Sequence, residues 1–324
     1  QVNLTSERIT ILSEKDITIQ NSTLESEGMI YNHLYNDPVG ATLDIDNSKV
    51  KVTAGSFDFD IDNLKIHNKS EVTATLTDEE AVTAILSYKG IDINDSKVTT
   101  NGTGYTVDSY GDVNIDKSIV IADAIREDEE VLISIIAYGE DEEGPKNVNI
   151  TNSWVDAAAL IDGTVNVRDS VVFEKNDGKV TGNPVIPDNV EVRKNHKLTV
   201  AEPTTITAPS GLAIANNGII NAYCTSIRGT VTGTAPVYTH ANTTKWVYDK
   251  TSHWKACTRC GEKVAAAEAH RYGSWKTLKA AGIGTSGAKE RHCTVCSYTQ
   301  GEDIAAVQVM QLLAKGGKKS VTLK

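Results

Sequence analysis

Alternating apolar and polar residues recur throughout the first 235 residues of the chain. Each copy has the pattern apolar-x-apolar-x-[Asn/Asp/Lys]-Ser-x-apolar, in which x is any residue. The first copy contains Ile17, Ile19, Asn21, Ser22 and Leu24. Alternation with a period of two is typical of a strand that buries one face. The repeated serines are Ser22, Ser48, Ser70 in a looser copy, Ser96, Ser118, Ser153 and Ser170.

The spacing of these serines indicates how the strands are arranged. Successive serines lie 26, 22, 26, 22, 35 and 17 residues apart, which is too short for a strand, a helix and a second strand in every repeat. The spacing is close to one coil of a parallel β-helix, in which stacked coils share one core. We therefore predict an all-β right-handed parallel β-helix over residues 1–240, with the polar residue and serine bending each coil at one corner.

The repeat resembles that of right-handed parallel β-helix proteins of the pectin-lyase-like type, especially those in surface proteins of Gram-positive bacteria. The resemblance covers about two thirds of the chain and implies a solenoid. Members of that superfamily include polysaccharide lyases and hydrolases, glycan-binding proteins and adhesive stalks, so the fold by itself leaves the activity open.

Three tyrosines recur in the same register as the serines. Tyr88 and Tyr110 each lie 8 residues before a repeated serine, and Tyr138 lies 15 before, which fits an insertion of about 7 residues. The three rings should therefore form a column at one corner. Such a column could stack against sugar rings as a ligand-binding site, or its rings could pack only against one another.

A run of alternating aspartates raises the question of catalysis or cation binding. Asp58, Asp60 and Asp62 share one strand face, opposite Phe57 and Ile61. We expect this face to be solvated, and a Ca²⁺ site is the alternative, because Ca²⁺ requires several oxygen ligands. No acid–base constellation is evident, so no catalytic residue is assigned. Three histidines among polar neighbours are expected at the surface: His33, His67 and His196.

The charge of the chain divides sharply near residues 236–245. From Lys245 onward there are 14 basic and 6 acidic residues, a net charge of +8, against 18 and 37 before it, a net charge of -19. The strongly acidic segment before Lys245 opposes binding of the chain to nucleic acid. No stretch approaches the ~20 apolar residues that a membrane-spanning helix needs, so no membrane insertion is expected in this segment. We expect a separate module over residues 241–303.

The module contains two CxxC pairs. Cys257 and Cys260 are separated by 32 residues from Cys293 and Cys296. Two such pairs can enclose one tetrahedral Zn²⁺, and this Cys₄ structural site is our first interpretation. Disulfides and a redox CxxC are alternatives. A further alternative is a Cys₂His₂ site on the first pair, with the ligands His253 and His270.

The module also resembles one that is found, often in tandem, in large surface proteins of Gram-positive bacteria. The resemblance covers about 60 residues and rests on His253-Trp-x-x-Cys257-x-x-Cys260-Gly, His270-x-Tyr-Gly-x-Trp and Arg-His-Cys293-x-x-Cys296. It implies an exported, multidomain protein. Residues 304–324 read as a short amphipathic helix, a glycine break and a strand, as at the start of a further domain.

Two functions from different classes follow from these patterns. The first is a non-catalytic extracellular surface protein that binds host or dietary glycans or cell-surface molecules, as an adhesin or stalk segment. The second is a polysaccharide-degrading enzyme, either a lyase or a hydrolase, built on the same fold. The lack of an evident acid–base pair favours the first.

Overall fold

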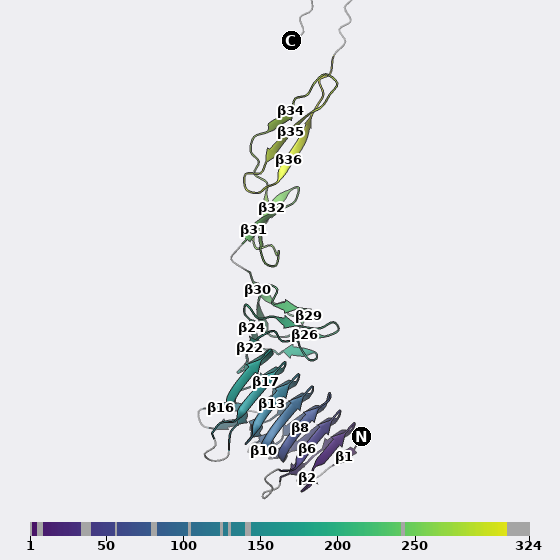
Figure 1. Cartoon of the computed structure of the whole chain (residues 1–324), viewed down its shortest axis with the longest axis vertical. Coiled ribbons are helices and arrows are strands. Elements are labelled where there is room, and N and C mark those ends of the chain that lie inside the picture. The colour runs from purple at the N-terminus through teal and green to yellow at the C-terminus, as the bar shows by residue number, and fades with distance from the viewer. Residues whose placement is uncertain are drawn as a thin grey trace, which may run out of the picture. The chain divides into compact units, whose positions relative to one another are not determined.

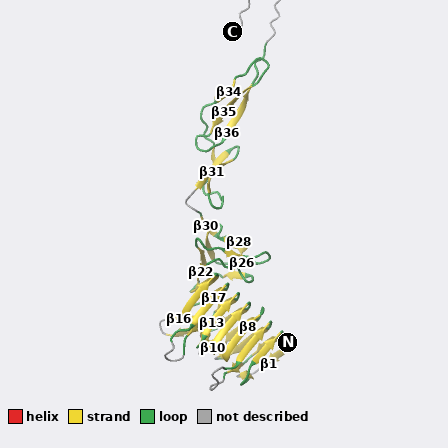
Figure 2. Ribbon diagram, in the orientation of Figure 1, coloured by secondary structure: helices red, strands yellow, loops and turns green. Residues whose placement is uncertain are grey.

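The protein is all-β in the part of the chain that the computed structural model describes, where no helix occurs (Figure 2). Within that part, no helix is long and apolar enough to span a bilayer. The chain divides into two compact units, Gln1–Thr239 and His240–Lys324. The described residues are 2–4, 9–33, 40–55, 57–78, 83–102, 105–123, 126–128, 131–139, 144–240 and 244–309.

The first unit contains a 12-stranded sheet to which successive repeats add successive strands (Figure 1). Its neighbours pair in parallel, except for the antiparallel pair β21 and β22. In order, its strands are β1 (Val2–Leu4), β4 (Thr23–Ser26), β7 (Lys49–Ala54), β9 (Glu71–Leu76), β11 (Lys97–Asn101), β14 (Ile119–Ala122), β18 (Trp154–Ala157), β21 (Ser170–Glu174), β22 (Asp177–Thr181), β24 (Lys197–Val200), β27 (Ile219–Tyr223) and β30 (Val237–Thr239).

A 13-stranded sheet contains the other strands of the same repeats. It is parallel apart from the pair β15 and β16. The long strand β10 pairs through its first half with β12 and through its second half with β13. The strands are β2 (Ile9–Leu12), β3 (Ile17–Gln20), β5 (Met29–Asn32), β6 (Thr42–Asp46), β8 (Phe57–His67), β10 (Thr83–Asn94), β12 (Tyr105–Ser109), β13 (Asp112–Asp116), β15 (Arg126–Asp128), β16 (Val131–Ala137), β17 (Asn147–Thr151), β19 (Leu160–Asp162) and β20 (Thr164–Arg168).

Two small parallel sheets complete the first unit after the repeat motif ends. They comprise β23 (Val190–Val192), β26 (Ala213–Asn216) and β29 (Thr230–Gly233), and the pair β25 (Ile206–Thr207) and β28 (Ile227–Arg228). The inward residues of the repeats form a continuous core of Ile, Val, Leu and Phe side chains, among them Leu43, Ile66, Ile91 and Val113. A second cluster, including Phe173 and Leu198, continues the core beneath the later strands.

The repeated serines form an uninterrupted hydrogen-bonded column. The backbone N–H of each serine donates to the hydroxyl of the serine in the next repeat, at N–O distances of 3.0 to 3.2 Å from Ser22 through to Ser170. The residue before each of these serines is left-handed, with φ of 66° at Lys69 and of 44° to 49° at Asn21, Asn47, Asp95, Lys117, Asn152 and Asp169. Asn and Asp tolerate this conformation. The predicted serine column and parallel pairing are confirmed.

Removing one hydroxyl from this column should destabilise the first unit. The fully buried Ser118 hydroxyl accepts from the N–H of Ser96 and donates to the carbonyl of Asp116, at 3.1 and 2.7 Å. In Ser118→Ala the Ser96 N–H loses its acceptor, so we expect a loss of about 1–3 kcal/mol in unfolding free energy, measured by urea denaturation. The matched control is Ser22→Ala, because this serine is exposed and its hydroxyl accepts no N–H within the described residues. Equal losses in the two variants would contradict the prediction.

The second unit contains two antiparallel sheets of three strands each. They are β31 (Thr244–Tyr248), β32 (Ser252–Cys257) and β33 (Glu268–Ala269), then β34 (Lys276–Lys279), β35 (Gly287–His292) and β36 (Thr299–Ile304). The helix expected from Ile304 is absent as far as Val309, because β36 ends at Ile304 and Val307 forms a bridge with Ile283. The rest of that expected segment lies outside the described residues.

Candidate functional sites

The three tyrosines predicted to share a corner form one column of rings. Tyr88 stacks on Tyr110 with a centroid separation of 5.6 Å and an interplanar angle of 2°, and Tyr110 lies 4.5 Å from Tyr138. His33 also stacks on Tyr88, at a centroid separation of 3.8 Å. Tyr138 is tilted by 55° against Tyr110, so all of these rings pack against one another within the column.

Carboxylates anchor the column. A hydrogen bond joins Tyr88 to Asp60, and another joins Tyr138 to Asp108. Burial raises the pKa of Asp60, and the electrostatic interaction with His33 and the Tyr88 hydrogen bond only partly offset this effect. Burial also raises the pKa of Tyr138, and its hydrogen bond to Tyr110 adds to the shift. The tyrosine corner is thus a coupled network of polar groups.

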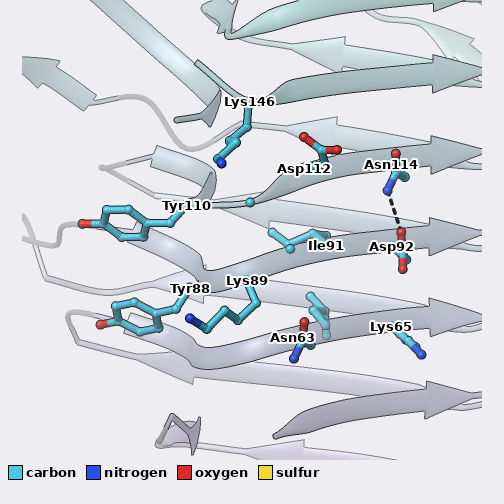
Figure 3. A pocket seen from close by; sticks show the side chains of 13 residues that line it. Asn63, Lys65, Tyr88, Lys89, Ile91, Asp92, Tyr110, Asp112, Asn114 and Lys146 are labelled. Carbon is cyan, nitrogen blue, oxygen red and sulfur yellow. Dashed lines mark hydrogen bonds between the residues drawn. The ribbon is translucent and has the colours of Figure 1, made fainter. Parts of the chain in front are cut away.

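A groove of about 460 Å³ lies beside this column, on β8, β10 and β13 (Figure 3). The rings of Tyr88 and Tyr110 stand at one end, as Figure 3 shows. Polar side chains along the strands line the rest of the groove, including Asn63, Lys65, Lys89, Asp92, Asp112 and Asn114.

The charges in this groove are not balanced internally. Asp92 accepts a hydrogen bond from the Asn114 amide at 2.8 Å, and Asp112 accepts one from the backbone N–H of Asn147 at 2.8 Å. In contrast, Lys65 and Lys89 are exposed and form no ion pair within the described residues. The groove therefore presents free cationic donors beside amide and carboxylate groups that already have partners.

A close approach of backbones at Gly111 shapes the end of the groove. A Cβ atom at this position would lie 1.7 Å from the carbonyl oxygen of Lys89, which is far inside van der Waals contact. Only glycine fits where the strands bend. This bend coincides with a register shift between Ser87 and Gly90, next to Tyr88.

Of the three aspartates predicted to form a solvated strand face, two are buried and Asp60 is partly buried, so that prediction was wrong. Asp58 and Asp62 are both fully buried. The chain after β5 returns over Asp62, whose carboxylate accepts from the N–H of Ala41 at 3.0 Å and contacts His33 Nδ1 at 2.6 Å. Among the described residues, the three carboxylates form no group close enough to share a calcium ion.

Asp58 is the most unusual of these carboxylates. Neither of its oxygens has a hydrogen-bond partner among the described residues. Burial raises its pKa to about 8, and the nearby backbone of Ala54 and Thr75 offsets only part of this effect. Asp58 does not line the groove described above.

Two of the histidines expected at the surface are also largely buried. His33 joins the tyrosine column and pairs with Asp62. His196 is 7% exposed, and its Nε2 lies 3.1 Å from Asp156, which also accepts from Arg193 Nε at 2.7 Å. Their carboxylate partners lie 29 and 40 residues away in sequence, so local polarity gave no sign of them.

In the second unit, the four module cysteines predicted to share one site are divided between two groups. Cys293 and Cys296 lie with His253 and His270, and all four ligand atoms are within 4.8 Å of one another. Cys257 and Cys260 lie with His240 instead. The predicted Cys₄ shell is therefore not formed, because the antiparallel strands bring histidines rather than the first CxxC pair to the second. None of the five cysteines is in a disulfide.

We refer to His253, His270, Cys293 and Cys296 as the Cys₂His₂ group. His253 Nδ1 is 3.4 Å from His270 Nδ1 and 3.8 Å from Cys293 Sγ, and Cys296 Sγ is 3.5 Å from His270 Nδ1. Two contacts fix the orientation of the His270 ring. Its Nε2–H donates to the carbonyl of Asp249 at 2.9 Å, and Tyr298 stacks on the ring at a centroid separation of 4.4 Å. Both imidazoles therefore point the same nitrogen, Nδ1, at the two thiols.

The surroundings of the Cys₂His₂ group favour a thiolate at Cys293, whereas burial and the neighbouring Cys293 raise the pKa of Cys296. Burial acts to raise the pKa of Cys293, but the backbone N–H groups of Val295 and Cys296, together with His270, outweigh it and lower the pKa to about 6. The thiolate form is the one that binds metals. The arrangement can thus hold one metal ion between two sulfurs and two nitrogens.

Comparison of the chain with models of protein families, with curated proteins and with solved structures yields no match in any of the three. The groove and the Cys/His groups are therefore the features from which we infer a function.

Proposed function

We propose that the first unit is a right-handed parallel β-helix of the pectin-lyase-like type and that it acts as a non-catalytic glycan-binding segment of an extracellular surface protein. Support for the β-helix comes from strands that pair in parallel with their counterparts one repeat later, and from the serine column that joins successive repeats. Each repeat then forms one coil.

The groove beside the tyrosine column carries the proposal of glycan binding. Amide, carboxylate and ammonium groups at successive strands offer donors and acceptors to sugar hydroxyls along an open surface, as in other ligand sites with a few placed polar groups. Lys65 and Lys89, which form no ion pair within the described residues, favour a glycan that bears carboxylates, such as a uronate polymer. The rings of Tyr88 and Tyr110 form the wall at one end.

We further propose that the Cys₂His₂ group binds a structural Zn²⁺. With Zn–N near 2.0–2.1 Å and Zn–S near 2.3 Å, a tetrahedral site has edges of about 3.4 Å between nitrogens and about 3.6 Å between nitrogen and sulfur. The distances of 3.4, 3.5 and 3.8 Å fit this shell. Four protein ligands leave no open position for hydrolysis, so the ion would hold the module together.

Calorimetric titration of the full chain tests the glycan-binding proposal. De-esterified polygalacturonate is the anionic probe and a neutral galactan the comparison. We expect binding of the anionic polymer, and a loss of about tenfold or more in affinity in the Lys65→Ala, Lys89→Ala double variant, because two charge-assisted contacts are removed. The matched control is the Lys49→Ala, Lys51→Ala double variant, whose exposed lysines lie on β7 of the other sheet. Equal affinities in the two variants would exclude the groove as the site.

The rival function of polysaccharide degradation makes a different prediction for the same samples. Burial raises the pKa of Asp58 and Asp60, but neither lines the groove. The groove is lined by two other carboxylates, those of Asp92 and Asp112. An enzyme would release reducing ends or unsaturated products from the bound polymer, and Asp92→Asn would abolish the release. A binding protein would release neither.

A further inference from the structure

The first CxxC pair has a backbone geometry that matches the second. The N–H of Cys257 donates to the carbonyl of Glu262 at 2.8 Å, five residues later, and the N–H of Cys293 donates to that of Tyr298 at 2.9 Å, also five residues later. The flanking residues pair in the same register, Ala256 with Lys263 and His292 with Thr299. The unit thus contains two equivalent knuckle hairpins.

The first knuckle also has an imidazole of its own. His240 Nδ1 lies 3.4 Å from Cys260 Sγ, close to the nitrogen–sulfur edge of a tetrahedral zinc shell, which is about 3.6 Å. The ligand atoms of His240, Cys257 and Cys260 all lie within 4.8 Å of one another, and neither cysteine is in a disulfide. Cys257 is fully buried, which is costly for a thiolate unless a cation compensates it.

The left-handed turn after this knuckle keeps the two thiols on one side. Gly261 has φ of 79°, and its N–H donates to the carbonyl of Cys257 at 3.0 Å. This is a conformation that glycine adopts without strain. The backbone is therefore already arranged for two sulfurs three positions apart to bind one ion.

We propose that the first knuckle is a second metal site, in which His240, Cys257 and Cys260 bind a Zn²⁺ separate from that of the Cys₂His₂ group. Two thiolates and an imidazole are typical zinc ligands. Because zinc takes four ligands, one further donor completes the shell. The second unit then holds two ions, one at each knuckle, rather than one ion between them.

Zinc stoichiometry of the full chain tests this proposal. Protein purified with zinc and dialysed against metal-free buffer should contain about two zinc ions per chain by elemental mass spectrometry. The Cys257→Ser, Cys260→Ser variant and the Cys293→Ser, Cys296→Ser variant should each retain about one. His240→Ala should lose one ion selectively at low free zinc, whereas the control His292→Ala, whose exposed ring contacts Thr299, should retain both.

The ion that remains in each double variant serves as an internal control for folding. Cobalt substitution adds a second readout, because the thiolate-to-cobalt absorption should fall when either pair is removed and persist at the other. One zinc ion in the unaltered chain that survives the loss of Cys257 and Cys260 would overturn the proposal while leaving the Cys₂His₂ site intact. A Cys257–Cys260 disulfide found by mass spectrometry in the zinc-loaded protein would also overturn it.

Discussion

Removing zinc by chelation is expected to unfold the second unit and leave the first unit folded. In the described part of the second unit, the five buried residues are His253, Ala256, Cys257, Gly287 and Cys293. Three of these, His253, Cys257 and Cys293, are proposed zinc ligands. A unit with so few buried apolar side chains cannot offset the conformational entropy lost on folding. Structural zinc contributes folding free energy directly, on the order of 10 kcal/mol or more in small zinc domains.

Tryptophan emission offers a direct measurement of this unfolding. Three of the four tryptophans, Trp246, Trp254 and Trp275, lie in the second unit. Each packs against a lysine or arginine side chain, as Trp275 does against Lys289, whose Nζ is 4.5 Å from the ring centroid. Chelation should shift this emission towards that of exposed indole, and re-addition of zinc should reverse the shift. Trp154, buried in the first unit, should contribute an unchanged component.

Substitutions separate loss of metal from direct damage by the chelator. His253→Ala and Cys293→Ser should each give part of the shift seen on chelation in the presence of zinc, because each loses the ion of the Cys₂His₂ group and keeps the ion at the first knuckle. The exposed His292 provides the control, because His292→Ala should keep the native spectrum until chelator is added. Native emission and native resistance to proteolysis in a sample shown to contain no metal would contradict the prediction.

The repeated parts of the fold could be predicted from the sequence because equivalent residues of each repeat occupy equivalent positions in the fold. The serine column, the parallel strands and the tyrosine column all follow from residues that recur in one register, so several copies support each inference. The same logic identified both CxxC turns, because their chemistry depends on local spacing.

Long-range partners were less predictable. His253 is on β32, and His270 directly follows β33, so the antiparallel pairing of these two strands brings both imidazoles to the second knuckle. Spacing between the CxxC pairs contains no information on this pairing. The sequence indicates His253 and His270 as alternative ligands, but it places them with the first CxxC pair and not with the second. His240 was missed, and its distance of 20 residues from Cys260 gave no spacing signal.

The burial of the aspartate run shows a similar limit. Alternation predicts which side chains share a strand face, and Phe59 and Ile61 are indeed in the core. It does not predict whether other chain segments cover the opposite face. The segment around Gly40 and Ala41 does so at Asp62, and this contact depends on the path of the chain between strands.

The fully buried Asp58 should make the stability of the first unit fall as the pH rises. Its pKa is about 8 in the folded protein, whereas a carboxyl in an unfolded chain titrates near 4. Between these values the folded protein holds a proton that the unfolded chain releases. Its stabilising contribution is therefore fully present below about pH 4, is lost progressively up to about pH 8, and changes by up to about 1.4 kcal/mol per pH unit.

Replacing this carboxyl with an amide should remove the dependence. We expect Asp58→Asn to match the unaltered protein near pH 4–5 and to exceed it by several kcal/mol at pH 8–9, where the native carboxylate would be charged without a partner among the described residues. At about 2–4 °C per kcal/mol, the difference should be visible in the calorimetric transition of the first unit. Asp177→Asn, on the exposed side of β22, is the matched control and should leave the pH profile unchanged. A carbon NMR titration that places the Asp58 carboxyl near pH 4, or parallel pH profiles for Asp58→Asn and the unaltered chain, would show that this carboxyl is solvated after all.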